Sequence, residues 1–158
     1  MKNKKKVFSL LLAFCILASV LCTPALATTD MSKSEEQVIY SEDGSYAVIT
    51  ITYDTPHTIF GRYAAKKTSG AKEYIYYNNA DQPLWTFRVH GSFEYDGNSV
   101  EAIDADYSQS VHVSFWSFVS ASAYCSGASA VANGTFKKGV APVSKIITLT
   151  CSKDGKLS

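Results

Sequence analysis

Three side chains that could do acid–base chemistry lie two and four residues apart in one stretch of this sequence. They are Arg88, His90 and Glu94. Successive side chains of an extended strand point to opposite faces, so residues two or four apart share a face. A histidine beside a carboxylate can act as a general acid or base, but cross-strand charge pairing is the commoner outcome. We therefore favour charge pairing, and a hydrolase is our third hypothesis.

Other reactive or metal-binding residues lack the spacing that a site needs. His57, His90 and His112 are scattered, and there is no H-x-H or C-x-x-C pattern, so we predict no metal and no other cofactor. The serines include no G-x-S-x-G motif. One acidic group offers oxygens to calcium without following the EF-hand pattern, and we interpret it as a solvated turn. Its members are Glu94, Asp96, Glu101, Asp104 and Asp106.

Cys125 and Cys151 are the only cysteines after residue 27. An isolated pair in an exported protein most often forms a disulfide. The bond would close a loop of about 26 residues and contribute ~3 kcal/mol through loop-closure entropy. The alternative is two reduced cysteines, because sequence does not give the distance between their Cβ atoms. We predict the disulfide.

The strand that must carry Arg88 and His90 is the most aromatic alternating run of the chain, residues 84–95. Apolar and polar residues alternate along it, which predicts a strand with one buried face, at the centre of an antiparallel sheet. Beyond the hairpin signal Asp96-Gly97 the alternation changes phase near Ile103, which predicts a β-bulge. The buried face should hold Trp85, Phe87, Val89, Phe93 and Tyr95.

Residues 38–158 are predicted to form a single all-β domain. Seven or eight strands with frequent turn signals and no convincing helix favour an antiparallel β-sandwich, with a barrel as second choice. Residues 28–37 are polar and without periodicity, so we expect a flexible segment there.

The N-terminal residues have the layout of a secretory signal peptide. Four lysines precede a run of fifteen apolar residues, Val7 to Leu21, and small residues follow up to Ala27, where we expect cleavage. The apolar run is shorter than the ~20 residues that span a bilayer, so no stable membrane anchor is predicted and the chain should be secreted into the extracellular space. Residues 28–158 then hold eleven Lys and Arg against fourteen Asp and Glu, a net charge of −3. This charge argues against nucleic acid and anionic membranes as partners.

Aromatic side chains give the leading functional hypothesis. All ten tyrosines follow residue 27, and exposed rings on secreted sheets bind sugars or proteins, although tyrosine also simply suits a half-wet sheet surface. Tyr74, Tyr76 and Trp116 can each be placed opposite an apolar face, so we expect exposed rings there. We therefore expect a non-enzymatic module that contacts an extracellular glycan or protein; the alternative is a secreted antimicrobial or toxin-like protein. Nothing in the sequence indicates an oligomeric state.

A resemblance to known proteins rests on three segments: LWTFRVHGSFEYDGNS, FWSFVSASAYCSGASAVANGTF and ITLTCSKDGKLS. They resemble a family of small exported proteins from clostridia and related Gram-positive bacteria, which is classed only as a domain of unknown function. The resemblance implies export and a β-rich domain, with no assigned catalytic or ligand residue. In that family the partner cysteine often lies near the position of Ile103, whereas this chain offers Cys125. The matching positions are Gly91, Phe93, Tyr95, Gly97, Trp116, Ser126, Gly127 and Cys151.

Overall fold

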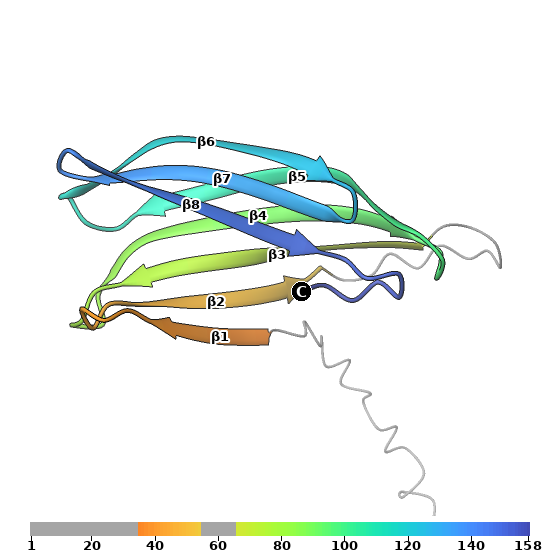
Figure 1. Cartoon of the computed structure of the whole chain (residues 1–158), viewed down its shortest axis with the longest axis horizontal. Coiled ribbons are helices and arrows are strands. Elements are labelled where there is room, and N and C mark those ends of the chain that lie inside the picture. The colour runs from red at the N-terminus through yellow and green to blue at the C-terminus, as the bar shows by residue number, and fades with distance from the viewer. Residues whose placement is uncertain (1–34, 55–65) are drawn as a thin grey trace, which may run out of the picture. The chain divides into compact units, whose positions relative to one another are not determined.

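The computed structural model describes residues 35–54 and 66–158, and none of these residues lies in a helix (Figure 1). The predicted signal peptide, most of the predicted flexible segment and His57 lie outside the described residues. No helix in the described ranges is long and apolar enough to cross a membrane. The strands are β1 (Glu35–Tyr40), β2 (Tyr46–Tyr53), β3 (Lys66–Tyr77), β4 (Pro83–Tyr95), β5 (Val100–Val111), β6 (Trp116–Ser126), β7 (Ser129–Lys138) and β8 (Ala141–Thr150).

These strands form two antiparallel sheets, with the orders β1-β2-β3-β4-β5 and β6-β7-β8. Every strand pairs with its neighbour in the chain, except that the chain passes from one sheet to the other between β5 and β6. The predicted all-β sandwich is confirmed, with two separate sheets in place of a closed barrel. The first strand begins at Glu35, three residues before the predicted start of the domain.

The core lies between the sheets and is filled largely from β4. Tyr95 is half-buried at the end of this strand. Phe136 of β7 stacks on Trp85, with ring centroids 4.3 Å apart. A Cβ at Gly134 of β7 would lie only 2.7 Å from the ring of Phe87 of β4. Glycine at this position therefore allows the two sheets to pack closely. The other predicted core residues of β4 are buried as expected: Trp85, Phe87, Val89 and Phe93.

A bulge in β5 keeps the apolar side of that strand inward. Ser92 pairs with Asp104 while Phe93 pairs with Ala102, so Ile103 has no partner in the ladder. The predicted change of phase near Ile103 is confirmed. Ala102 is buried as a result, whereas Ile103 is 44% exposed.

The two sides of the sandwich differ. On one side β5 and β6 lie together, and the Ala102 N–H donates to the Gly127 carbonyl at 2.8 Å. On the other side β8 lies against β3 and β4 and reaches neither β1 nor β2. The second sheet therefore leaves part of the inward face of the first sheet uncovered. We call this region the open flank and define it by Ile39, Ile49, Lys72, Tyr74, Tyr76, Val143 and Lys145.

Candidate functional site

The residues predicted for acid–base chemistry do lie on one face of β4, the outer face, but they do not act on one another. His90 Nε2 is 2.8 Å from Asp54 Oδ2. Glu94 Oε1 is 2.9 Å from Nζ of Lys67, its direct cross-strand neighbour. Arg88 faces outward in the same row as Glu73 of β3. The expected charge pairing is therefore found for Glu94.

Asp54 is the residue of this outer face that the sequence reasoning missed. Burial raises the pKa of its carboxyl, and hydrogen bonds from His90 and Ser69 outweigh that effect, so the pKa lies below its ordinary value. Asp54 follows β2 directly and is 36 residues from His90 in the chain. Only the pairing of β2 with β3 and β3 with β4 brings it close.

The predicted acidic group is built around a hairpin turn. Asp96 accepts hydrogen bonds from the backbone N–H of Asn98 at 2.8 Å and of Ser99 at 2.7 Å. These bonds lower the pKa of Asp96. His112 Nε2 bonds the hydroxyl of Thr86 at 2.9 Å, and Thr86 lies four residues before His90 on β4. Across residues 35–54 and 66–158, no group of three or more His, Cys, Asp or Glu side chains could hold a metal ion.

The predicted disulfide is wrong, because a strand lies between the two cysteines. Cys125 pairs with Ala130 of β7, and Ala130 pairs with Leu149 of β8. Two strand spacings, ~9.5 Å, exceed the roughly 7 Å between Cα atoms that a disulfide can bridge. Both cysteines are free thiols; Cys125 is exposed, and burial raises the pKa of Cys151.

The three rings predicted to bind a ligand lie together, but not as exposed rings. Tyr74 and Tyr76 pair with Phe87 and Trp85, so they point inward. Both tyrosines are half-buried, and Trp116 is only 7% exposed, so the expected exposure of these rings is wrong. The reason is the register of β3 on β4, which turns this tyrosine set toward the second sheet.

Trp85 joins these rings into one aromatic cluster on the open flank. Its ring centroid is 5.4 Å from that of Tyr74 and 5.4 Å from that of Tyr76. Tyr76 also meets Trp116 edge-on at 6.2 Å. The indole N–H groups of Trp85 and Trp116 are buried without a hydrogen-bond partner among the described residues.

Lys145 of β8 places its amine on this cluster. Its Nζ lies 3.7 Å from the centroid of the Tyr74 ring, a cation–π contact that joins the two sheets. Burial lowers the pKa of Lys145 and raises the pKa of Tyr74. Both groups are half-buried, so each is packed against protein and still reachable from solvent.

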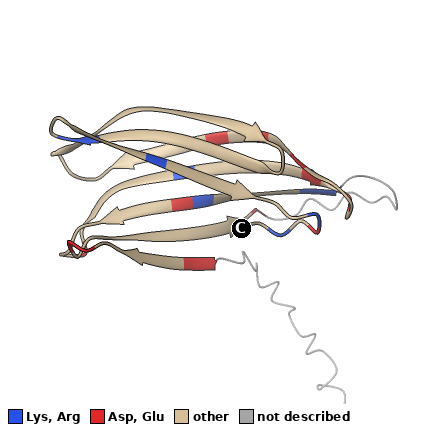
Figure 2. Ribbon diagram, viewed as in Figure 1, with Lys and Arg blue, Asp and Glu red and all other residues tan. Residues whose placement is uncertain are grey.

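Lys72 brings a second amine to the same side of β3. It lies two residues before Tyr74 and pairs with Ile51 and Val89, so its side chain leaves the inward face. Burial lowers its pKa as well. Within the part of the chain that the structure describes, neither Lys72 nor Lys145 has a carboxylate within 4.0 Å. Charged segments of β3 and β8 can be followed in Figure 2.

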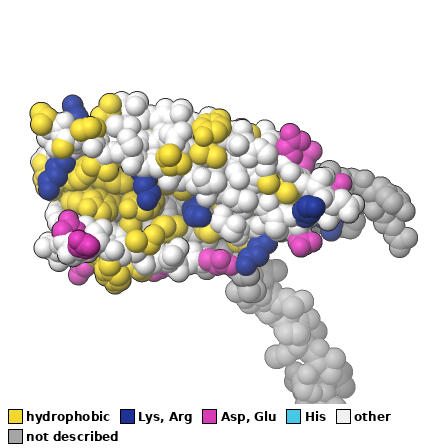
Figure 3. All heavy atoms as spheres, viewed as in Figure 1, with side chains coloured by type: hydrophobic (Ala, Val, Ile, Leu, Met, Phe, Trp, Pro, Cys, Tyr) yellow, Lys and Arg dark blue, Asp and Glu magenta, His cyan; other side chains and the backbone are white. Residues whose placement is uncertain are grey.

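Figure 3 shows hydrophobic side chains gathered between the two sheets on this face of the molecule, with basic side chains beside them. Hydroxyl groups border this region at one end. The Tyr76 hydroxyl donates to Ser45 Oγ at 2.9 Å, and the Ser45 hydroxyl donates to Asp43 Oδ1 at 2.6 Å. Hydrogen bonds from the Ser45 hydroxyl and the Ser45 backbone N–H lower the pKa of Asp43.

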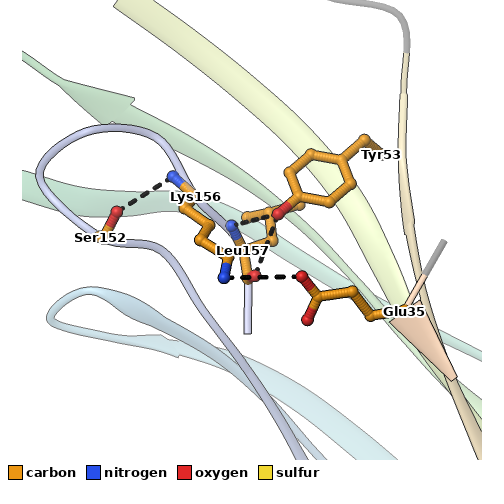
Figure 4. A network of polar contacts seen from close by, with 5 residues as sticks. All are labelled: Glu35, Tyr53, Ser152, Lys156 and Leu157. Carbon is orange, nitrogen blue, oxygen red and sulfur yellow. Dashed lines mark hydrogen bonds and ion pairs between the residues drawn. The ribbon is translucent and has the colours of Figure 1, made fainter. Parts of the chain in front are cut away.

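The other end of the inward face is closed by the C-terminal segment (Figure 4). Leu157 is fully buried, and its N–H donates to the Tyr53 hydroxyl at 2.9 Å. That hydroxyl donates back to the Leu157 carbonyl at 3.1 Å. Lys156 Nζ lies 3.5 Å from Glu35 Oε1 on β1. The open flank is therefore bounded by Leu157 at one end and by the Ser45 hydroxyl at the other.

Sequence reasoning misses Lys145. For Lys66, Lys67 and Lys72 it favours a solvated turn over an anion contact, whereas all three residues lie in β3. A lysine in a strand ordinarily faces water, and Lys72 and Lys145 each lie in a run where both faces carry polar residues. No family model, curated protein or solved structure matches this chain.

Proposed function

We propose that this chain is a non-enzymatic extracellular module that binds a glycan along the open flank. The observation that carries the proposal is the half-buried pair of rings, Tyr74 and Tyr76, with the amine of Lys145 over the first of them. Aromatic faces stack on the apolar faces of sugar rings, and neighbouring amines and hydroxyls bond the sugar hydroxyls. Export rests on the lysine-rich start, the apolar run and the small residues up to Ala27, and a place among the exported clostridial proteins is part of the same proposal.

Two properties of the open flank support a glycan over a folded protein as ligand. The flank is a strip between two sheets, closed at one end by Leu157, and an extended polymer fits a strip better than a flat protein surface does. The flank also has polar groups beside its rings, because the Lys145 amine lies over Tyr74 and the Tyr76 hydroxyl bonds Ser45. Amines and hydroxyls in such positions can bond sugar hydroxyls.

Retention on insoluble glycans tests this proposal. The secreted chain is mixed with peptidoglycan, chitin or mucin, and the pellet is assayed for protein while the supernatant is assayed for released sugar. We expect retention with no released sugar, and loss of retention in Tyr74→Leu. Tyr77→Leu is the matched control, because Tyr77 is on the same strand but faces outward, stacked on Tyr46. Failure of every glycan to retain the chain, or sugar release that needs His90, would refute the proposal.

A further inference from the structure

We infer that the open flank takes an acidic glycan, whose sugars carry carboxylate or phosphate groups, with Lys72 and Lys145 as the amines that bind those groups. The inference rests on the proposed function and narrows its ligand class.

Lys72 and Lys145 carry their amines to the same face from two different sheets. Lys72 and Tyr74 are one pleat repeat apart on the same face of β3, about 7 Å between Cα atoms. Lys145 arrives from β8 and sets its amine over the same tyrosine. Each sheet therefore contributes one amine to this face: Lys145 lies over the Tyr74 ring, and Lys72 is two residues before Tyr74 on the same side of β3. Alternating sugar rings and anionic groups can match this arrangement.

Neither Lys72 nor Lys145 has a carboxylate partner among the described residues. Glu35 lies in the same row as Lys72, two strands away, but its carboxylate pairs with Lys156. Asp43 bonds Ser45 at the end of the flank. Removing a charge from water without a partner is unfavourable, and burial lowers the pKa of both amines. An anionic group on the ligand would supply the missing partner and raise the lowered pKa of both amines.

The positive charge of the open flank contrasts with the net negative charge of residues 28–158. Residues 28–158 carry a net charge of −3, so long-range attraction does not favour anions. The basic character of the flank is local, which suits recognition at contact distance. A neutral sugar chain would need only rings and hydroxyls and would leave both amines without a counter-charge. The cation–π contact also holds the Lys145 amine in place before the ligand arrives, which reduces the entropy cost of binding.

Binding titrations with three soluble polymers test the inference. Polygalacturonate supplies carboxylates, a glycerol phosphate polymer supplies phosphates, and a neutral galactan is the control. The variant Lys72→Met, Lys145→Met keeps the apolar stems and removes both amines. The variant Lys67→Met, Lys137→Met removes the same charge from outer faces. We expect at least one acidic polymer to bind and the inner variant to weaken it by about tenfold or more, as for the loss of charged hydrogen bonds, while the outer variant binds like wild type.

The outcomes separate the two proposals. Equal binding of galactan and acidic polymers, unaffected by the inner variant, overturns the acidic ligand and leaves a glycan-binding flank. Binding of none of the three polymers by a chain that peptidoglycan, chitin or mucin retains overturns the acidic ligand alone, and failure with all six overturns both proposals. Should the inner variant fail to fold, the wild-type chain still decides: binding of an acidic polymer at alkaline pH must take up protons, because the anion raises the lowered pKa of the two amines. Binding without proton uptake there contradicts the inference. The carboxylate and phosphate polymers tell the two sources of negative charge apart.

Discussion

The outer and inward faces of the β3–β4 pair treat their charges in different ways. On the outer face Lys67 pairs with Glu94 and His90 pairs with Asp54, at 2.9 and 2.8 Å. On the inward face Lys72 and Lys145 lie half-buried among aromatic rings, and no described carboxylate reaches them. Charges that are already paired and solvated have little to gain from a ligand. Of the three residues most suggestive of chemistry in the sequence, His90 and Glu94 are therefore paired with neighbours on the outer face, whereas Lys72 and Lys145 on the inward face have no described carboxylate partner.

Truncation of adjacent β4 residues should give the largest contrast between the faces. Phe87→Ala removes a fully buried ring that meets Phe136, so we expect a loss of about 3–5 kcal/mol in the free energy of unfolding. Arg88→Ala, on the outer face, should cost about 0.5 kcal/mol or less. Urea denaturation of both variants measures the difference. Similar losses of stability in the two variants would show that the outer face of β4 is as tightly packed as its inward face.

The closed end of the inward face should be the next most sensitive region. Leu157→Ala leaves a cavity between the sheets, and we expect a loss of about 2–5 kcal/mol. Tyr53→Phe removes the hydroxyl that bonds the backbone of Leu157, with an expected loss of about 1 kcal/mol. Thermal or urea unfolding checks both. A wild-type midpoint in Leu157→Ala would mean that the C-terminal segment does not close the sandwich.

The outer ion pair should contribute little. Lys67 and Glu94 are 50% and 39% exposed, and solvent screens their attraction. A double-mutant cycle with Lys67→Ala and Glu94→Ala should give a coupling of about 0.2–1 kcal/mol that shrinks in high salt. A larger, salt-independent coupling would place this pair in a less solvated environment than the structure shows.

Alkaline pH should affect the inward lysines in a defined direction. Burial lowers the pKa of Lys72 and Lys145 below the ordinary 10.5. As the pH rises through the folded-state pKa toward 10.5, the folded chain loses these protons first, so their contribution to stability increases with pH. Tyr74 acts in the opposite direction from pH 10.0 upward, because burial raises its pKa. The effect of the lysines on stability is therefore measured below pH 10.0, where Tyr74 does not yet oppose it.

Replacing both lysines by Met should remove this alkaline gain. At neutral pH the stability of the variant should differ from that of the wild type by ~0.5 kcal/mol or less, because the lost Lys145 cation–π contact offsets the gain from removing two half-buried charges. Urea denaturation at a series of pH values measures the trend. The outer variant Lys67→Met, Lys137→Met should keep the wild-type slope; the same slope in all three proteins would mean that the inward amines are fully solvated.

The sequence predicted β4 and its bulged neighbour well, and it did so for a physical reason. In β4 one face is aromatic and the other polar, so alternation alone tells which side is buried. The loss of phase at Ile103 marked the bulge in the same way. In β3 one face carries Lys72, Tyr74 and Tyr76. The other face carries Glu73 and Tyr77, so both faces combine charged and aromatic side chains. Only the register on β4 decides which set points inward, and alternation does not give that register.

Strand order explains the other differences. Cys125 and Cys151 suggested a bond because they are an isolated pair, but β7 lies between β6 and β8. Asp54 meets His90, and Lys145 meets Tyr74, across large separations in the chain. Contacts of this kind depend on the order of the strands and on how the two sheets pack. Local residue patterns do not determine either of these.

Chemical-shift mapping by NMR tests the central claim most directly. The isotope-labelled chain is titrated with an oligogalacturonate, and the backbone amide resonances of residues 35–54 and 66–158 are followed. The account predicts that shift changes concentrate on the open flank, at Tyr74, Lys145 and Val143, while His90 and the rest of the outer face stay unchanged. Changes confined to the outer face, or no change with any acidic or neutral oligosaccharide, would contradict it.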